Sequence, residues 1–141
     1  MDKQIDRFLN ETVPDMPNNP WSAEGLRRAE KAALELFPTT ASVEQSENRD
    51  VADQFHRFVG EVFRRNFEGV WLNVPTFDDA ERSRGFGPVI QRPFAQFYLG
   101  VIQTLTTAID RRVGDIWAQG FAYSEEDFQA WIESGRPTIA E

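Results

Sequence analysis

The chain has 141 residues, a formal net charge of −8 and no cysteine, and 40% of its residues are hydrophobic and 13% aromatic. This length and apolar content predict one globular domain over residues 1–141 and exclude a disordered chain. The acidic charge argues against nucleic-acid binding, because an acidic surface repels phosphates, and the lack of cysteine excludes disulfides and thiolate chemistry.

The N-terminal stretch "MDKQIDRFLNETV" has charges every few residues and lacks the apolar segment of a signal peptide. No apolar run approaches the roughly 18 residues that a membrane span needs. We therefore expect a soluble, cytoplasmic protein with no membrane partner.

The first third of the chain predicts two helices separated by a loop that contains several prolines. Asp2 is expected to cap a short helix with Ile5 and Phe8 on its apolar side. Ser22 is the expected N-cap of the second helix, and Pro38 ends it.

A longer amphipathic helix is expected next. It begins either at a capping box of Ser42 and Gln45 or near Asp50, and it continues to about Phe67. Its apolar stripe consists of Val51, Phe55, Phe58, Val59, Val62 and Phe63. Glu61 falls on the opposite side, where it suits surface ion pairs with arginines four positions away in each direction.

Gly69 is expected to break this helix and to start a hairpin. Residues 70–74 alternate with a period of two, and residues 88–92, with the sequence PVIQR, are expected to form a second short strand, so the two predict an antiparallel hairpin. If the valines and the leucine of the first strand face the helices, Trp71 and Asn73 face outward.

The last third of the chain predicts two more helices. Pro93 suits the first turn of a long helix that Gly114 ends, and residues 115–123 then form an aromatic connector. Ser124 and Asp127 form a capping box that starts the last helix. We therefore expect a mainly helical α+β fold with about five helices and one two-stranded antiparallel hairpin.

Two glycines, Gly60 and Gly100, fall in the middle of predicted helices. Glycine costs up to about 1 kcal/mol at such a position, so a physical reason for it is close approach of another backbone. The hypothesis is that the two helices cross near these glycines.

The sequence contains little that indicates catalysis. The only histidine, His56, follows Asp53 by three residues, but no second histidine or cysteine completes a metal site, and hydrogen bonding within the helix is the simpler interpretation. No nucleophile motif or phosphate-binding loop is present. A pair of carboxylates, Glu61 and Glu68, remains as an alternative for an enzyme. We expect no metal, no cofactor and no enzymatic activity.

The hairpin is the predicted binding surface, because an exposed tryptophan beside arginines is typical of interface hot spots. Cover by the 75–86 loop or by the connector, and a small-ligand pocket, are the alternatives for Trp71. The predicted contact residues are Trp71, Asn73, Phe77, Asp78, Asp79, Arg82 and Arg84. The acidic C-terminal helix is a second candidate surface.

The segment "FVGEVFRRNFEGVW" contains Gly60, Glu61, Gly69 and Trp71, and "GPVIQRPF" follows as the second strand. It resembles a helix–Gly-Glu–x–Gly–x–Trp–strand element of uncharacterised small bacterial proteins, some of which are grouped with immunity proteins of toxin systems. Glu68 stands here where the pattern usually has a second glycine. The resemblance implies an α+β fold and a non-catalytic role.

These observations predict a non-enzymatic, acidic protein-binding module, such as an immunity-type inhibitor, an adaptor or a chaperone. The negative charge favours a basic protein partner, such as a nuclease toxin. The alternative is a protein that binds a small anionic ligand through the arginines of the hairpin.

Overall fold

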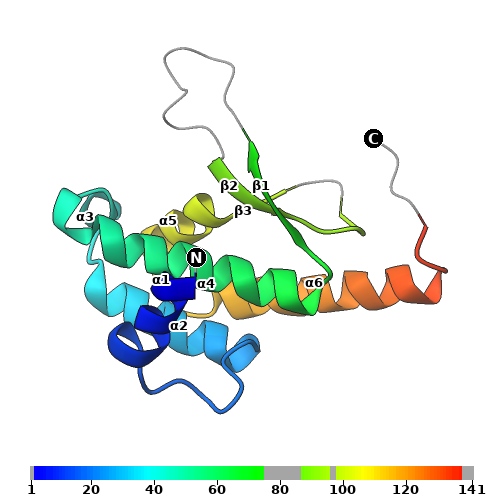
Figure 1. The fold of residues 1–141 in the computed structure, drawn as a ribbon, viewed down its shortest axis with the longest axis horizontal. Helices are drawn as coiled ribbons and strands as arrows, with labels where there is room; N and C mark the ends of the chain where they lie inside the picture. Colours follow the sequence, from blue (N-terminus) through cyan, green and yellow to red (C-terminus); the bar gives the residue numbers. More distant parts are fainter. Residues whose placement is uncertain (1, 75–86, 96–97, 138–141) are drawn as a thin grey trace.

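The computed structural model describes residues 2–74, 87–95 and 98–137. In Figure 1, helix α4 crosses the middle of the molecule, with the sheet above it and α1 and α2 below it. The elements are α1 (Asp2–Arg7), the π-helical turn η1 (Phe8–Thr12), α2 (Ala23–Leu36), α3 (Thr40–Val43), the 3-10 turn η2 (Ser46–Asn48), α4 (Arg49–Asn66), β1 (Val70–Val74), β2 (Gly87–Gln91), β3 (Leu99–Gly100), α5 (Val101–Arg111) and α6 (Ile116–Glu133). The predicted mainly helical α+β class is confirmed.

The starts of the N-terminal helices confirm one predicted cap and correct another. The Gly25 N–H donates to Ser22 Oγ at 3.2 Å, so Ser22 is the N-cap of α2 as predicted. The predicted capping box of Ser42 and Gln45 is wrong. Thr39 is the N-cap of α3, and its capping-box partner is Ser42, the third residue of that helix. The long helix α4 begins at Arg49, close to the alternative start at Asp50.

Helix α4 is the centre of the core, and its predicted apolar stripe is buried except for Val51, which is partly buried. Phe8 from η1 stacks on Phe58 with ring centroids 4.6 Å apart, and it meets Phe55 edge to face at 4.9 Å. Phe37, at the C-cap of α2, and Trp117 of α6 also contact Phe55, with ring centroids 5.9 Å and 6.5 Å away. Aromatic burial of this kind is the main source of stability in a domain of this size.

The corner between α4 and β1 uses two residues where the sequence predicts one. Glu68 adopts the left-handed conformation with φ 55°, and the Gly69 N–H donates to the Arg64 carbonyl at 3.0 Å, which closes a Schellman motif. Gly69 is needed for space, because a Cβ there would lie 2.6 Å from Ile90 Cγ2. Helix α4 therefore ends through the left-handed conformation of Glu68, and Gly69 leaves the space next to Ile90 that a side chain would need.

The sheet has three strands instead of the predicted two. β1 pairs antiparallel with β2, with Val70 opposite Gln91, and β3 pairs with the other edge of β2. The expected helix start at Pro93 is wrong, because α5 begins only at Val101. Gly100 consequently lies at the N-cap of α5 instead of its middle, so the proposed crossing of helices at Gly60 and Gly100 is also wrong.

The C-terminal helices also differ from the prediction. α5 ends at Arg111, three residues before Gly114, since Arg112 takes the left-handed conformation with φ 53°. The expected connector and the capping box at Ser124 are wrong, because α6 runs without a break through both. Ser124 is buried in the middle of α6.

The start of α6 depends on a residue that is distant in sequence. Glu30 of α2 is fully buried, and its carboxylate accepts hydrogen bonds from the Ile116 N–H at 3.2 Å and the Trp117 N–H at 2.8 Å. Burial raises the pKa of Glu30, although these backbone N–H groups oppose the rise. A local sequence pattern cannot show this cap, because donor and acceptor lie in different helices.

Candidate functional site

The face of α4 that meets β1 is built around Trp71. Its indole lies over Gly60, where a Cβ would come within 2.1 Å of Trp71 Cη2, and its Nε1 donates to Glu61 Oε2 at 2.7 Å. Trp71 therefore faces the helix and is only partly exposed. Two of the three side chains considered as facing the helices are exposed instead: Val70 is 56% exposed and Leu72 36%, and the side chain of Val74 is outside what the structure describes.

Glu61 is the acceptor at the centre of this junction. It is 5% exposed, which corrects the expectation of a surface ion pair. Arg64 donates to it through Nε at 2.6 Å and Nη2 at 3.0 Å, and Arg65 through Nε at 3.0 Å. Burial alone would raise the pKa of Glu61, but the bonds from Arg64, Trp71 and Arg65 outweigh it and lower the pKa to about 2.

The two carboxylates considered for an enzyme, Glu61 and Glu68, form ion pairs with different arginines. Glu61 stays ionised near neutral pH, so it has no proton to give as a general acid. Glu68 is exposed, and Arg136 Nη1 lies 2.6 Å from its Oε2. The structure therefore does not give Glu61 the raised pKa that a glycosidase acid needs.

A cavity of about 330 Å³, here named the sheet pocket, lies beside Trp71. Its volume is within the range of small-ligand sites. Its described lining consists of Asp53, His56 and Arg57 from α4, Trp71 and Leu72 from β1, Pro88 from β2 and Val101 from α5. Trp71 thus contacts helix α4 and also lines the sheet pocket.

His56 is the titratable base in this lining. Its Nε2 is buried and has no hydrogen-bond partner within the part of the chain that the structure describes. Burial lowers the pKa of His56 to about 4, with Asp53 opposing and Arg57 adding to the fall. The imidazole is therefore neutral near pH 7.

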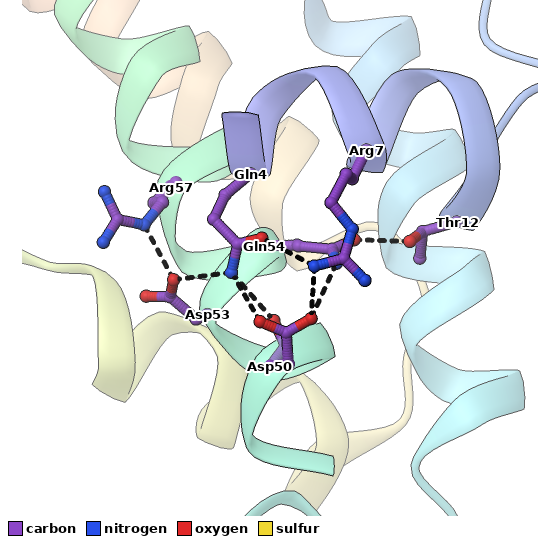
Figure 2. A network of polar contacts seen from close by, with 7 residues as sticks. All are labelled: Gln4, Arg7, Thr12, Asp50, Asp53, Gln54 and Arg57. Atoms are coloured by element: carbon purple, nitrogen blue, oxygen red, sulfur yellow. Dashed lines mark hydrogen bonds and ion pairs between the residues drawn. The ribbon is translucent and has the colours of Figure 1, made fainter. Parts of the chain in front are cut away.

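Asp53 belongs to a polar network that fastens α1 to the start of α4 (Figure 2). Gln4 Nε2 donates to Asp53 Oδ2 at 3.0 Å and to Asp50 Oδ1 at 2.9 Å, and Arg57 Nε donates to Asp53 Oδ2 at 2.8 Å. Burial opposes ionisation, but these bonds outweigh it and lower the pKa of Asp53. Arg7 pairs with Asp50 at 2.8 Å. The carboxylate of Asp53 therefore links α1 to α4 and is not a free catalytic group.

The predicted binding surface is only partly described. Trp71 faces inward, and the side chain of Asn73 is outside what the structure describes. Phe77, Asp78, Asp79, Arg82 and Arg84 all lie outside the described residues. Their role in binding stays a prediction.

The described arginines near the hairpin bind groups of the same chain. Arg64 and Arg65 hold Glu61, and Arg92 Nη1 donates to Ser124 Oγ at 2.8 Å. Burial lowers the pKa of Arg92, with Asp127 opposing. These side chains stabilise the fold, and the sequence alone did not show the contact between Arg92 and α6.

Metal sites, membrane spans and similarity to known proteins add no further functional feature to the described residues. Within the described ranges, no three His, Cys, Asp or Glu side chains come together as a metal site. No helix in the same ranges is long and apolar enough to cross a membrane. No protein family, no curated protein and no solved structure matches the chain. The resemblance to immunity proteins therefore stays a prediction.

One sequence signal did point to the site. A glycine in the middle of an amphipathic helix indicates a close approach, and Gly60 has one. The approaching group is the indole of Trp71, eleven residues later, instead of another helix. The sheet pocket and the role of His56 in its wall had no signal in the sequence, because four elements build that wall.

Proposed function

We propose that the chain is a non-enzymatic protein-binding module that takes a partner along the edge of β1. The observation that carries this proposal is the exposure of Val70 and Leu72, at 56% and 36%, on a strand at the end of the strand order. Trp71, between them, faces the helix, so the exposed apolar side chains are on the opposite face of the strand.

An edge strand offers unpaired backbone groups to an extended segment of another protein. Proteins usually protect such edges with charged side chains, proline or a bulge. The β1 sequence VWLNV contains no charged residue and no proline. Among the residues that the structure describes, β1 is therefore an edge strand with exposed apolar side chains and no charged residue or proline of its own, which supports partner binding by strand addition.

The charge of the chain supports a basic partner. The net charge is −8, and the 18 residues of α6 include four acids and no base. Glu125, Glu126, Asp127 and Glu133 are all exposed. Complementary charge speeds the encounter of proteins more than it strengthens the complex. An inhibitor of a basic toxin, an adaptor or a chaperone fits this chemistry, and a cytoplasmic location fits a chain without cysteine.

The test is a pull-down from lysate of the source organism, with wild type beside Val70→Lys. Val113→Lys is the matched control, because Val113 is 63% exposed and lies beyond the end of α5. We expect a basic protein that wild type and the control retain and that Val70→Lys loses. Calorimetry with the purified partner then measures the loss. Equal retention by all three forms, or no captured protein, would refute the proposal.

The alternative function, binding of a small anionic ligand through arginines of the hairpin, has less support. Arg64, Arg65 and Arg92 bind acceptors of their own chain, and Arg82 and Arg84 lie outside the described residues. Benzoate and inorganic phosphate, titrated into the protein by calorimetry, test this alternative directly.

A further inference from the structure

A second and larger cavity, here named the helical pocket, lies between α3, α4 and α5. Its volume is about 710 Å³, which fits a small organic molecule. It shares Asp53 and His56 with the sheet pocket. Val43, Ala52 and Ile102 add apolar surface to its wall.

Two polar atoms of the helical pocket's lining residues have no partner. They are His56 Nε2 from α4 and Gln103 Oε1 from α5, and each atom is covered by protein. Neither has a hydrogen bond to any group in the described part of the chain. Buried polar atoms are nearly always paired in folded proteins, so two unpaired atoms on residues that line one cavity require an explanation. Gln103 also lines a cavity of about 360 Å³ beside Trp117, but His56 does not.

The chemistry of these two atoms restricts what can pair with them. Gln103 Oε1 accepts hydrogen bonds and does not donate them. His56 is neutral near pH 7, because burial lowers its pKa to about 4, so its Nε2 does not attract an anion. A partner must therefore donate to Gln103 and form a neutral hydrogen bond with His56.

The charges around the pocket also favour a neutral ligand. Asp53 is paired with Arg57, and the two remaining ionic side chains of the lining, Glu44 and Arg49, have opposite signs. The described lining has one more acid than base, and Arg57, which pairs with Asp53, lies outside it, so the charges give no strong preference for an ion.

We propose that the helical pocket binds a small neutral molecule that carries an N–H donor beside a carbonyl or ring nitrogen, such as a carboxamide or an N–H heterocycle. The N–H group donates to Gln103 Oε1, and the adjacent polar group pairs with His56 Nε2. Because both atoms are covered, the two side chains rotate toward the cavity as the ligand enters. The apolar wall takes the body of the molecule.

The chain offers a direct readout, because His56 is its only histidine. The imidazole Cε1–H signal in a ¹H–¹³C spectrum therefore reports binding in the two pockets that His56 lines, and a variant of Gln103, which lines the helical pocket and not the sheet pocket, distinguishes between them. Benzamide and 2-pyridone are the neutral probes, and benzoate and benzylammonium are charged controls of similar size. We expect saturable shifts of the His56 signal at millimolar benzamide, as a ligand of this size permits, and at least about fivefold weaker binding of benzoate and benzylammonium.

Gln103→Leu removes the acceptor and keeps the size of the side chain. Benzamide should bind to this variant about fivefold more weakly. Gln129→Leu, at an exposed position of α6, is the matched control and should bind as wild type does.

Three outcomes would overturn the proposal: no shift of the His56 signal up to the solubility of the neutral probes, benzoate or benzylammonium binding as tightly as benzamide, or unchanged affinity in Gln103→Leu. The first two use the wild-type protein, so they hold even if the variant does not fold.

Discussion

Gly60→Ala should destabilise the protein, although alanine is the better helix former. The added Cβ would lie 2.1 Å from Trp71 Cη2 and 2.5 Å from Cζ2, so the indole must move. Movement breaks the 2.7 Å bond from Trp71 Nε1 to Glu61, which is worth about 1.5–3 kcal/mol as a bond to a charged group. Overpacking adds about 1–3 kcal/mol, and helix propensity returns about 1 kcal/mol.

The expected net loss in free energy of unfolding is therefore about 2–5 kcal/mol. Urea unfolding at pH 7, followed by circular dichroism, measures it, and an unchanged m-value shows that the comparison is valid. Gly120→Ala in α6 is the control, because no atom lies within 4 Å of a Cβ there, and it should gain about 0.5–1 kcal/mol.

A double-mutant cycle identifies the cause of the loss. A Trp71→Ala background removes the three atoms that lie nearest to the new methyl group, so Gly60→Ala should become neutral or stabilising. The reasoning is refuted if Gly60→Ala alone is as stable as wild type, or if it costs the same free energy with and without the indole.

Three further predictions concern buried ionisable groups. Glu61→Gln should lower the free energy of unfolding by about 1.5–3 kcal/mol at pH 7, measured in urea. The folded pKa of Glu61, about 2, is below its ordinary value of 4.5, so this stabilisation is lost as pH falls from 4.5 toward 2. A cost that persists at pH 2 would contradict the prediction. The His56 signal should titrate with a midpoint near pH 4, and because the unfolded imidazole takes its proton near 6.5, stability should fall as pH drops from 6.5 to 4; a midpoint above 6 would show that the imidazole is not buried. Glu30→Ala should cost about 2 kcal/mol and speed hydrogen exchange at the N–H groups of Ile116 and Trp117, whereas Glu30→Gln, which keeps one acceptor, should cost less.

The helices that the sequence predicted best are those whose signals are local. Ser22 and Pro38 bound α2, and the apolar stripe of α4 from Phe55 to Phe63 is buried as its spacing of three and four residues requires. The alternation of residues 70–74 likewise predicted β1 with its correct bounds. In each case the cap, the periodicity or the proline acts within a few residues of its effect.

The errors occur where distant segments meet. Residues near Tyr98 continue a helical apolar pattern, but Leu99 and Gly100 pair with β2 instead, because the edge of that strand needs hydrogen-bond partners. Helix α6 begins at Ile116, ahead of the local capping box at Ser124, since the carboxylate of Glu30 satisfies its first N–H groups.

The sequence by itself determined the mainly helical α+β class, the bounds of α2 and β1 and the buried face of α4, because each of these follows from spacing along one element. Only the tertiary structure decided which face of β1 meets the helix. A period of two allows both faces, and the choice came from Gly60, which leaves room for an indole, and Glu61, which accepts its N–H. That choice turned Trp71 inward, left Val70 and Leu72 exposed on the edge strand, and made Trp71 part of the wall of the sheet pocket.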